Sequence, residues 1–246
     1  MLDSCLPEAL WYADTVQRLA PGVEVWAGED GPIGGGNDGT CGKDSVCGTF
    51  ASVAWYADNL AIRALHGFVQ YQRQDLFGGA YGLVSSRSSA MALGAEEPVV
   101  LRPDFWVNYL WKRCLGVSVL NATSSSPMVR AYAFTGAPPS EWAAGGCSAS
   151  PLQLLLINLS SNSSTPVTLP TAGLPSAFVS YQLTPVGGEP FAAQALLNGA
   201  SLPLEVDVAR ADPAAFLHAI PVPPQAGTVA QGPVLPPLST TFLCFK

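Results

Sequence analysis

The 246-residue sequence is short of charged residues, histidine and long apolar runs. Only 12% of its residues are charged, whereas about a quarter is typical of soluble domains. The formal net charge of −7 argues against general nucleic-acid binding, because that function needs a basic face. No run of about eighteen apolar residues is present, so we expect no segment of this sequence to span a membrane.

Histidine and cysteine are not arranged as metal ligands usually are. The sequence has two histidines and six cysteines, and no two cysteines form a CxxC pair. We therefore expect neither a metal site nor a bound cofactor. An oxidising compartment would let some cysteines pair, but we expect Cys114 to be a buried free thiol.

Three N-x-[ST] sequons, at Asn121, Asn158 and Asn162, fall in a stretch rich in serine and threonine. Such sequons are glycosylation acceptors in secreted proteins. We therefore expect an extracellular or secretory-pathway protein, with the cell wall, lysosome, vacuole or a membrane surface as possible sites. The first nineteen residues lack the basic start and apolar core of a signal peptide, so a secreted protein would carry its signal upstream of Met1.

Residues 1–116 alternate helical segments with short apolar runs. The patterns predict helices over residues 7–21, 49–66 and 103–115. The runs VEVWAG and FVQYQRQDLFGG between them are predicted strands. This order is typical of βα units with a parallel sheet, but two strands are too few for a (β/α)8 barrel, which needs about 250 residues.

Residues 117–246 have the pattern of an antiparallel β-sandwich domain. Short strand candidates alternate with turns rich in proline, glycine, serine and asparagine. The candidates are VSVLNAT, VRAYAFT, LQLLLINLSS, TPVTLP, FVSYQLTP and TTFLCFK. The segment 220–239 is rich in proline and glycine and is predicted to be a surface loop.

The glycine-rich segment at residues 28–39 has two interpretations. Its glycines fit the dinucleotide fingerprint G-x-G-x-x-G, with Asp58 about twenty residues further on. Glu29 and Asp30 oppose this reading, because two carboxylates would repel a pyrophosphate, and Asp58 falls inside a predicted helix. A P-loop fails as well, since Asp44 stands where serine or threonine is needed. A nucleotide-binding oxidoreductase is therefore disfavoured.

The other interpretation makes Glu29 a catalytic carboxylate. It ends a predicted strand, and the carboxyl ends of strands carry the chemistry of βα barrels. A glycine-rich loop would let a substrate approach backbone N–H groups closely. Alternatively, Glu29 is an acidic residue at the N-terminus of a helix, where the helix dipole stabilises it. The proline and glycines that follow Glu29 argue against a helix that begins there.

Four ordered segments resemble glycoside hydrolase family 79, the heparanase and plant β-glucuronidase family. VEVWAGED and its glycine-rich loop resemble the strand that carries the family's nucleophilic glutamate. TFASVAWYADNLA resembles the next helix, and YQRQDLFGGAYGLV resembles the segment RQ-x-[LF]-x-GG-x-Y-x-L. RPDFWVNYLWKRCLGVSVL resembles the PD-[YF]-[WY] helix that leads into a C-terminal sandwich. The resemblance implies the last units of a (β/α)8 barrel over residues 1–116 and a β-sandwich over residues 117–246.

The resemblance also implies roles for individual residues. Glu29 would be the nucleophile, Gln74 would lie beside the sugar, and Gly79 and Tyr81 would hold a uronic-acid carboxylate through a backbone N–H and a phenol hydroxyl. A retaining glycosidase needs two carboxyl groups about 5–5.5 Å apart, and neutral N–H and O–H donors suit a uronate. Taken singly, Tyr81 could equally be an interface aromatic, Gln74 a polar strand residue and Gly79 a turn residue.

The sequence departs from the family pattern in two places. The loop after Glu29 reads GPIGGG and lacks the family's Ala-Tyr pair, although backbone contacts from Gly34 and Gly35 are still expected. No Asn-Glu dipeptide occurs in the 246 residues, so the family's acid/base glutamate is missing, together with the earlier βα units. We expect those units upstream of this chain.

Disulfides are the last implication of the resemblance. A long-range pair in the family implies a bridge between Cys147 and Cys244 that ties the final strand to the sandwich. Cys41 and Cys47 are expected to form a local loop clasp.

We therefore expect an incomplete retaining glycoside hydrolase that acts on β-linked glucuronic acid in a glycan or a small glucuronide. By itself the chain is expected to be inactive. The alternative is a non-catalytic carbohydrate-binding or structural module.

Overall fold

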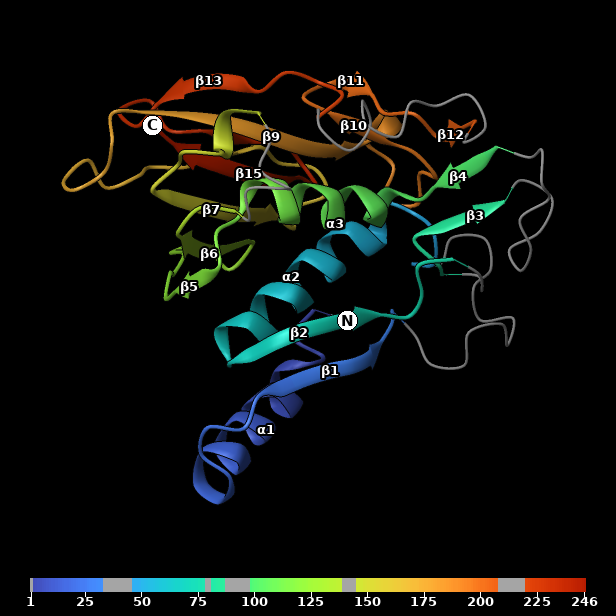
Figure 1. Cartoon of the computed structure of the whole chain (residues 1–246). Coiled ribbons are helices and arrows are strands. Elements are labelled where there is room, and N and C mark those ends of the chain that lie inside the picture. The colour runs from blue at the N-terminus through green and yellow to red at the C-terminus, as the bar shows by residue number, and fades with distance from the viewer. Residues whose placement is uncertain (1, 33–45, 78–80, 87–97, 139–144, 208–219) are drawn as a thin grey trace.

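The computed structural model of the chain describes residues 2–32, 46–77, 81–86, 98–138, 145–207 and 220–246. Its elements lie in layers (Figure 1). A large antiparallel sheet forms one side, and helices α2 (Ala51–Leu65) and α3 (Pro103–Cys114) pack against it. A small sheet of β1 (Val25–Asp30) and β2 (Phe68–Arg73) lies on the other side of α2, with α1 (Leu6–Leu19) beyond it.

The three helices form where the sequence predicts them. α1 and α3 each have a proline in the first turn, where the missing N–H costs no hydrogen bond. α3 also has Asp104 in its first turn and Lys112 and Arg113 in its last, which suits the helix dipole. α2 is followed by Gly67 with a φ of +84°, a left-handed conformation that favours glycine and ends the helix.

β1 and β2 pair in parallel and are linked through α2, as the βα pattern predicts. Within the described residues they form a two-stranded sheet, and no closed barrel is present. A second small sheet was not predicted. It contains β3 (Val84–Ser86), β4 (Val99–Leu101) and β12 (Glu205–Val206), so it joins the first half of the chain to the second.

The large sheet contains eight antiparallel strands, with β15 at its centre between β7 and β9. Its strands are β5 (Ser118–Leu120), β6 (Val129–Thr135), β7 (Leu152–Asn158), β9 (Ala177–Pro185), β10 (Ala195–Leu197), β11 (Ala200–Ser201), β13 (Gln225–Thr228) and β15 (Thr240–Phe245). Two short 3-10 helices, η1 (Gly145–Cys147) and η2 (Val186–Gly188), lie between strands.

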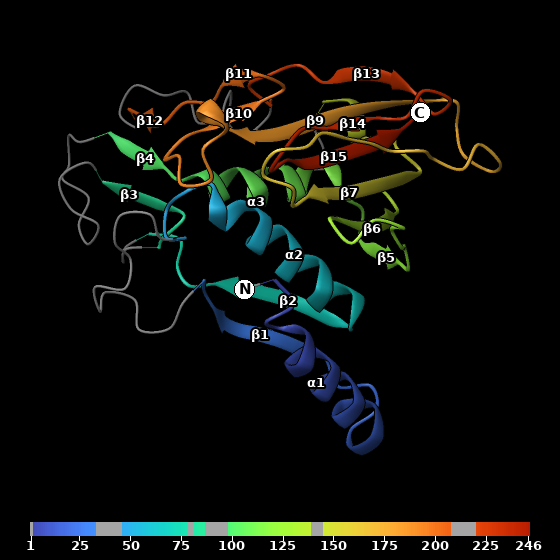
Figure 2. The ribbon, with the colours of Figure 1, turned by 180° about the vertical axis from the view of Figure 1, so that it is seen from behind.

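Successive side chains of β15 face opposite sides of this sheet, as strand geometry requires. Phe242 and Cys244 join the main core, which also contains buried residues of α2 and α3. Leu243 and Phe245 join a smaller cluster on the opposite face. The sheet therefore buries both faces, and the helices cover one of them (Figure 2).

The opposite face is partly covered by a two-stranded sheet of β8 (Thr165–Pro166) and β14 (Val234–Leu235). The sequence pattern predicts a β-sandwich. The described strands form one large sheet with this small second layer, so a sandwich of two full sheets stays a prediction. The segment 220–239, predicted to be a loop, supplies β13 and β14. Both strands lie at edges, where prolines nearby remove no central hydrogen bond.

None of the helices in the described parts of the chain has the length and apolar character needed to cross a membrane.

Candidate functional site

The parallel strands β1 and β2 end at the same edge of their sheet. Asp30 and Arg73, the last residues of the two strands, are paired. The backbone N–H of Gln74 donates to the carbonyl oxygen of Asp30 at 2.9 Å. The carboxyl ends of parallel strands are where α/β folds place their sites, so this edge is the candidate site.

A β-bulge lies just before the end of β1. Between Ala27 and Asp30 the pairing with β2 slips, so β1 holds one residue more than β2 there. Gly28 and Glu29 are the two residues in the bulge, and both are exposed. Ala27 before them is buried, and Asp30 after them is half-buried. Bulges re-aim side chains beside active sites. Here the bulge leaves Glu29 facing solvent while Asp30 contacts helix α2.

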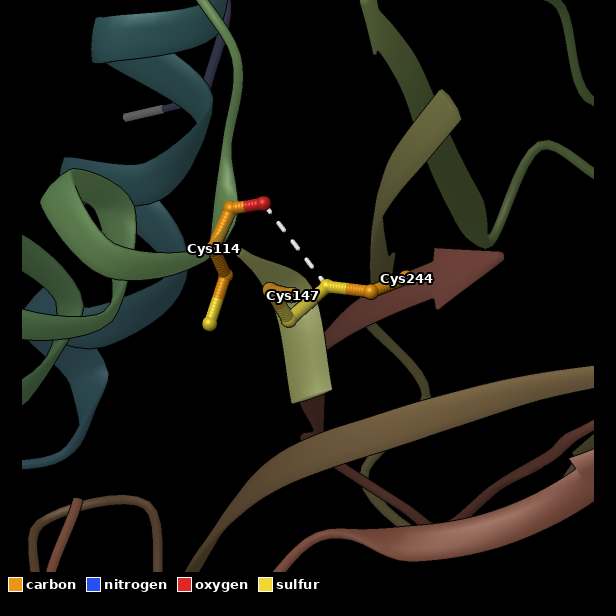
Figure 3. A group of neighbouring side chains, drawn as sticks. All are labelled: Cys114, Cys147 and Cys244. Atoms are coloured by element: carbon orange, nitrogen blue, oxygen red, sulfur yellow. Dashed lines mark hydrogen bonds between the residues drawn. A yellow bond between two sulfur atoms is a disulfide. The ribbon is translucent and has the colours of Figure 1, made fainter. Parts of the chain in front are cut away.

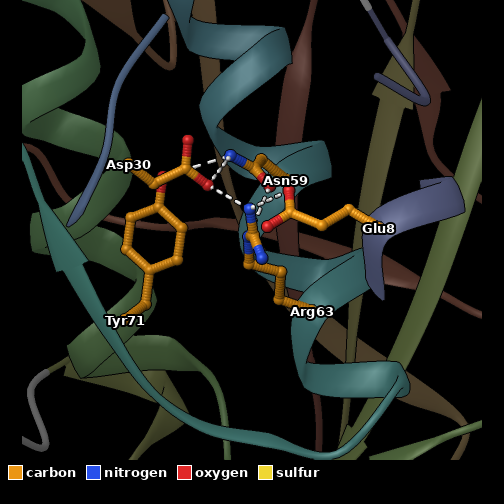
Figure 4. Close-up of polar contacts among 5 residues, drawn as sticks. All are labelled: Glu8, Asp30, Asn59, Arg63 and Tyr71. Carbon is orange, nitrogen blue, oxygen red and sulfur yellow. Dashed lines mark hydrogen bonds and ion pairs between the residues drawn. The ribbon is translucent and has the colours of Figure 1, made fainter. Parts of the chain in front are cut away.

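A polar network on the helix side holds Asp30 (Figure 4). Arg63 of α2 forms an ion pair with it, with Nη2 2.6 Å from Oδ2. Asn59 donates from Nδ2 to the same oxygen at 3.0 Å and to the Tyr71 hydroxyl at 3.1 Å. Arg63 also reaches Glu8 of α1 at 3.3 Å. Asp30 therefore ties β1 to α2, and Arg63 extends the network to α1.

The charges of this network follow from burial and proximity. Burial raises the pKa of Tyr71, and the Asp30 carboxylate raises it further, so the hydroxyl stays protonated. Burial lowers the pKa of Arg63, but the carboxylates of Asp30 and Glu8 raise it by more. The guanidinium therefore stays charged beside the Asp30 carboxylate.

Arg73, at the end of β2, contacts α3 and the Tyr81 segment. Its side chain is only 5% exposed, and its Nη2 lies 3.0 Å from Oδ2 of Asp104 in the first turn of α3. The same nitrogen donates to the backbone carbonyl of Tyr81 at 2.8 Å. Its guanidinium carbon lies between 5.4 and 5.7 Å from the ring centroids of Trp55, Tyr56 and Tyr81. Cation–π contacts of this kind favour a fixed orientation.

Gly31 shows how closely the two strand ends approach Tyr81. A methyl group added at Gly31 would lie 3.2 Å from the carbonyl oxygen of Gln74 and 3.3 Å from Cε2 of Tyr81. Both distances are tighter than ordinary contacts, so glycine permits this packing. Gly31 follows Glu29 by two residues, so the segments that carry Glu29, Gln74 and Tyr81 meet at this edge.

The residues that the sequence predicts for catalysis and substrate binding differ in their exposure. Glu29 and Gln74 are exposed, and Tyr81 is buried. Gly34, Gly35 and Gly79 lie outside the described residues.

Sequence reasoning missed the residues that support this edge, namely Arg63, Asn59, Arg73 and Asp104. One signal was available, because Asn59 and Arg63 stand four residues apart on a largely apolar helix and so share a face. Arg73 and Asp104 belong to the quoted RQ and PD motifs, but nothing in the sequence alone pairs them.

The structure contains the disulfide between Cys147 and Cys244, the pair that the resemblance predicted, and Cys114 is the expected buried free thiol. Cys5 is a second buried free thiol. Cys47 is disulfide-bonded, whereas Cys41 lies outside the described residues.

The sequon at Asn158 is not usable in this fold. Asn158 is 1% exposed, and its Nδ2 donates to three backbone carbonyls, those of Ser163, Leu235 and Pro236. A glycan on that nitrogen would have no room, so the expectation for Asn158 is corrected. Asn121 and Asn162 are exposed and stay predictions.

No protein-family model matches the chain. Several individual proteins are nevertheless similar to it. Heparanase-like protein 2 of Arabidopsis thaliana is 35% identical over 147 residues, 59% of this chain and 23% of that protein. Heparanase of Bos taurus is 34% identical over 128 residues, 52% of this chain and 21% of that protein. Baicalin-beta-D-glucuronidase of Scutellaria baicalensis is 28% identical over 191 residues, 77% of this chain and 32% of that protein.

Solved structures share the fold at low identity. The GH51 alpha-L-arabinofuranosidase of Thermotoga petrophila superposes with a TM-score of 0.57 at 10% identity, over 98% of this chain and 47% of that one. CelM2, a bifunctional glucanase-xylanase from a metagenome library, gives 0.52 at 16% identity, over 98% of this chain and 34% of that one.

The chain spans between about a fifth and a third of the length of the curated relatives it matches. Over that part, it is related to the heparanases, the heparanase-like proteins and a plant β-glucuronidase, the family that its motifs resemble.

Proposed function

We propose that this chain supplies part of the active site of a retaining glycoside hydrolase that cleaves β-linked glucuronic acid. Glu29 is the nucleophile in this proposal, and Gln74 lies beside the sugar. Tyr81, with the N–H of Gly79, binds the uronate carboxylate. Gly34 and Gly35 offer backbone contacts to the same substrate.

The observation that carries the proposal is the position of Glu29. It lies in a bulge at the carboxyl end of a parallel strand, exposed, beside the edge where Gln74 and Tyr81 meet. Relatives named heparanase and baicalin-beta-D-glucuronidase support the substrate class.

Retaining hydrolysis also needs a carboxylic acid that protonates the leaving oxygen. Asp30 is unsuited to that role, because it is ion-paired to Arg63 on the helix side of β1. Asp75 follows β2, and burial raises its pKa, which suits an acid. We nevertheless infer that the acid comes from βα units outside these 246 residues, because the same units would also complete the barrel.

The proposal extends to the partners and the location of the protein. Its partners are glucuronic-acid-containing glycans or glucuronides, and its place is the secretory pathway or outside the cell. The Cys147–Cys244 disulfide supports that location, since disulfides persist in oxidising compartments.

The proposal is tested with the natural polypeptide that contains these 246 residues and with the isolated chain. An aryl β-D-glucuronide is offered to each, with Glu29→Gln as the variant. We expect turnover by the longer protein, loss of that turnover to background in Glu29→Gln, and no turnover by the isolated chain. Full activity of Glu29→Gln in the longer protein would refute the role of Glu29. Turnover by the isolated chain that Asp75→Asn abolishes would make Asp75 the acid.

The alternative function is a carbohydrate-binding or structural module, favoured by the missing Asn-Glu pair. It predicts that the longer protein binds glucuronate without turning over any aryl glucuronide. Calorimetric titration with glucuronate, beside the aryl glucuronide assay, distinguishes the two functions. A binding module would bind glucuronate equally well with and without Glu29→Gln, and neither protein would show turnover.

A further inference from the structure

Three buried sulfur atoms meet where α3 ends against the large sheet (Figure 3). Cys114 is the last residue of α3, Cys147 closes η1, and Cys244 lies in β15. Their Sγ atoms all lie within 4.8 Å of one another, and each of the three residues is 0% exposed. Cys147 and Cys244 are joined as a disulfide, and Cys114 is a free thiol.

We propose that this cluster is a thiol–disulfide exchange site, in which the Cys114 thiol competes with Cys244 for Cys147. In the exchange step the Cys114 sulfur attacks Cys147 Sγ. The Cys147–Cys244 bond breaks, a Cys114–Cys147 bond forms, and the proton of the Cys114 thiol passes to the Cys244 sulfur. One disulfide and one thiol are present before and after the step, so no oxidant or reductant is consumed.

The geometry favours Cys244 as the leaving group. Its Sγ lies 3.7 Å from the backbone carbonyl oxygen of Cys114. A disulfide sulfur carries no hydrogen, but the thiol released from Cys244 would be a donor with an acceptor already beside it.

The surroundings keep the exchange slow. All three cysteines belong to the main apolar core, and burial raises the pKa of the Cys114 thiol. The attacking species is the thiolate, so the resting protein holds the Cys147–Cys244 bond. Opening of the contact between α3 and η1 would hydrate Cys114 and release this restraint.

Exchange would move a covalent link from one part of the fold to another. The present bond ties the central strand β15 to η1 across 97 residues. The exchanged bond would tie α3 to η1 and leave β15 without a covalent link, held by its backbone pairing and its packing in the core. The cluster would thus couple the covalent support of the large sheet to the position of α3, the helix whose Asp104 pairs with Arg73.

Cys244→Ser tests the proposal, because it removes the resting partner of Cys147. In the folded, air-oxidised variant we expect a Cys114–Cys147 disulfide, detected as linked peptides by non-reducing mass spectrometry. Cys5→Ser is the matched control, since Cys5 is also a buried free thiol but lies outside the cluster. That control should keep the Cys147–Cys244 bond and a free Cys114. Free thiols at both Cys114 and Cys147 in folded Cys244→Ser would overturn the proposal.

A second measurement keeps the test decisive if Cys244→Ser does not fold. The unmodified chain is incubated without added thiol, quenched with acid at intervals, and alkylated. We expect a population with Cys114 linked to Cys147 and Cys244 alkylated, which rises to a steady level and is absent in Cys114→Ser. A Cys147–Cys244 linkage that stays complete at every time would overturn the proposal.

Discussion

Gly31 is the residue on which the packing at the strand ends depends most directly. Gly31→Ala would place a methyl group against the Tyr81 ring and the Gln74 carbonyl, so one of them must shift by a few tenths of an ångström. We expect a loss of about 1–3 kcal/mol in the free energy of unfolding, as for other overpacked sites. Urea denaturation measures this loss, and near-UV circular dichroism follows the ring.

Gly28→Ala is the matched control, because a methyl group at Gly28 meets nothing within 4 Å. Its free energy of unfolding should stay within about 0.5 kcal/mol of the unmodified chain. Equal losses in the two variants would contradict the close approach at Gly31.

Asp58 should make stability depend on pH. It is buried, and its Oδ1 accepts a hydrogen bond from the Tyr132 hydroxyl at 2.6 Å. Burial raises its pKa by more than Tyr132 and Arg130 lower it, so the folded state binds this proton more tightly than the unfolded chain. Its contribution to the free energy of unfolding is therefore greatest below its ordinary pKa of about 3.9 and falls as the pH rises through the raised value.

Asp58→Asn removes that titration while keeping the shape of the side chain. Urea denaturation at a series of pH values should show a smaller fall in stability above about pH 4 in the variant than in the unmodified chain. Parallel curves for the two proteins would show that Asp58 does not titrate differently on folding.

At the scale of elements, α2 fastens the end of β1 through Arg63. Arg63→Ala would leave the largely buried Asp30 carboxylate without its charge partner. Removing one partner of a buried pair typically costs about 3–5 kcal/mol, and we expect a loss toward the lower end because Asn59 still donates to Asp30. Thermal or urea unfolding measures it.

Glu8→Gln provides the comparison for Arg63→Ala. Glu8 contacts the same guanidinium, but its side chain is 53% exposed, so the change should cost less than about 1 kcal/mol. A loss in Glu8→Gln as large as that in Arg63→Ala would mean that the Asp30 pair is not the important contact.

Elements with a strong local signal were predictable, and those made by tertiary pairing were not. The three helices have end signals and apolar periodicity, and β1, β2, β7, β9 and β15 are continuous apolar or alternating runs. The short strands β3, β4 and β12 form only where separate segments of the chain pair. β10 and β11 are an exception, because they form a local hairpin over Asn198 and Gly199, a turn signal that the sequence analysis did not use. β13 and β14 form in a segment whose prolines and glycines indicate a loop.

The candidate site shows the same division. The place of Glu29 near the carboxyl end of a strand was predictable from the sequence pattern, whereas its role stays a prediction. The bulge that separates the direction of Glu29 from that of Asp30 was not predictable, because a bulge depends on the register between β1 and β2. The pairing of Arg73 with Asp104 across 31 residues likewise depends on how α3 packs.

At the scale of the whole molecule, the sheet of β1 and β2 has edges that pair with no described strand. Val69 of β2 is 61% exposed, and Trp26 of β1 is exposed as well. Exposed strand edges with apolar side chains promote association. We expect the isolated chain to self-associate as its concentration rises, measured by sedimentation velocity.

Val69→Lys should reduce this association, because a charge on an edge strand opposes pairing. Val234→Lys is the control, since Val234 is similarly exposed, at 58%, but belongs to β14, which lies on the other side of the molecule from β1 and β2 (Figure 2). An equal reduction in both variants would point to general charge effects and contradict a role for the β1–β2 edge.

Covalent labelling tests the central claim, that Glu29 is the nucleophile of a retaining glycosidase. The natural polypeptide that contains this chain is treated with a 2-deoxy-2-fluoro-glucuronide carrying a good leaving group, then digested and analysed by mass spectrometry. The mechanism forms a glycosyl-enzyme ester, so we expect the adduct on Glu29 and none in Glu29→Gln. An adduct on another carboxylate, in a protein whose Glu29→Gln variant remains active, would contradict the account.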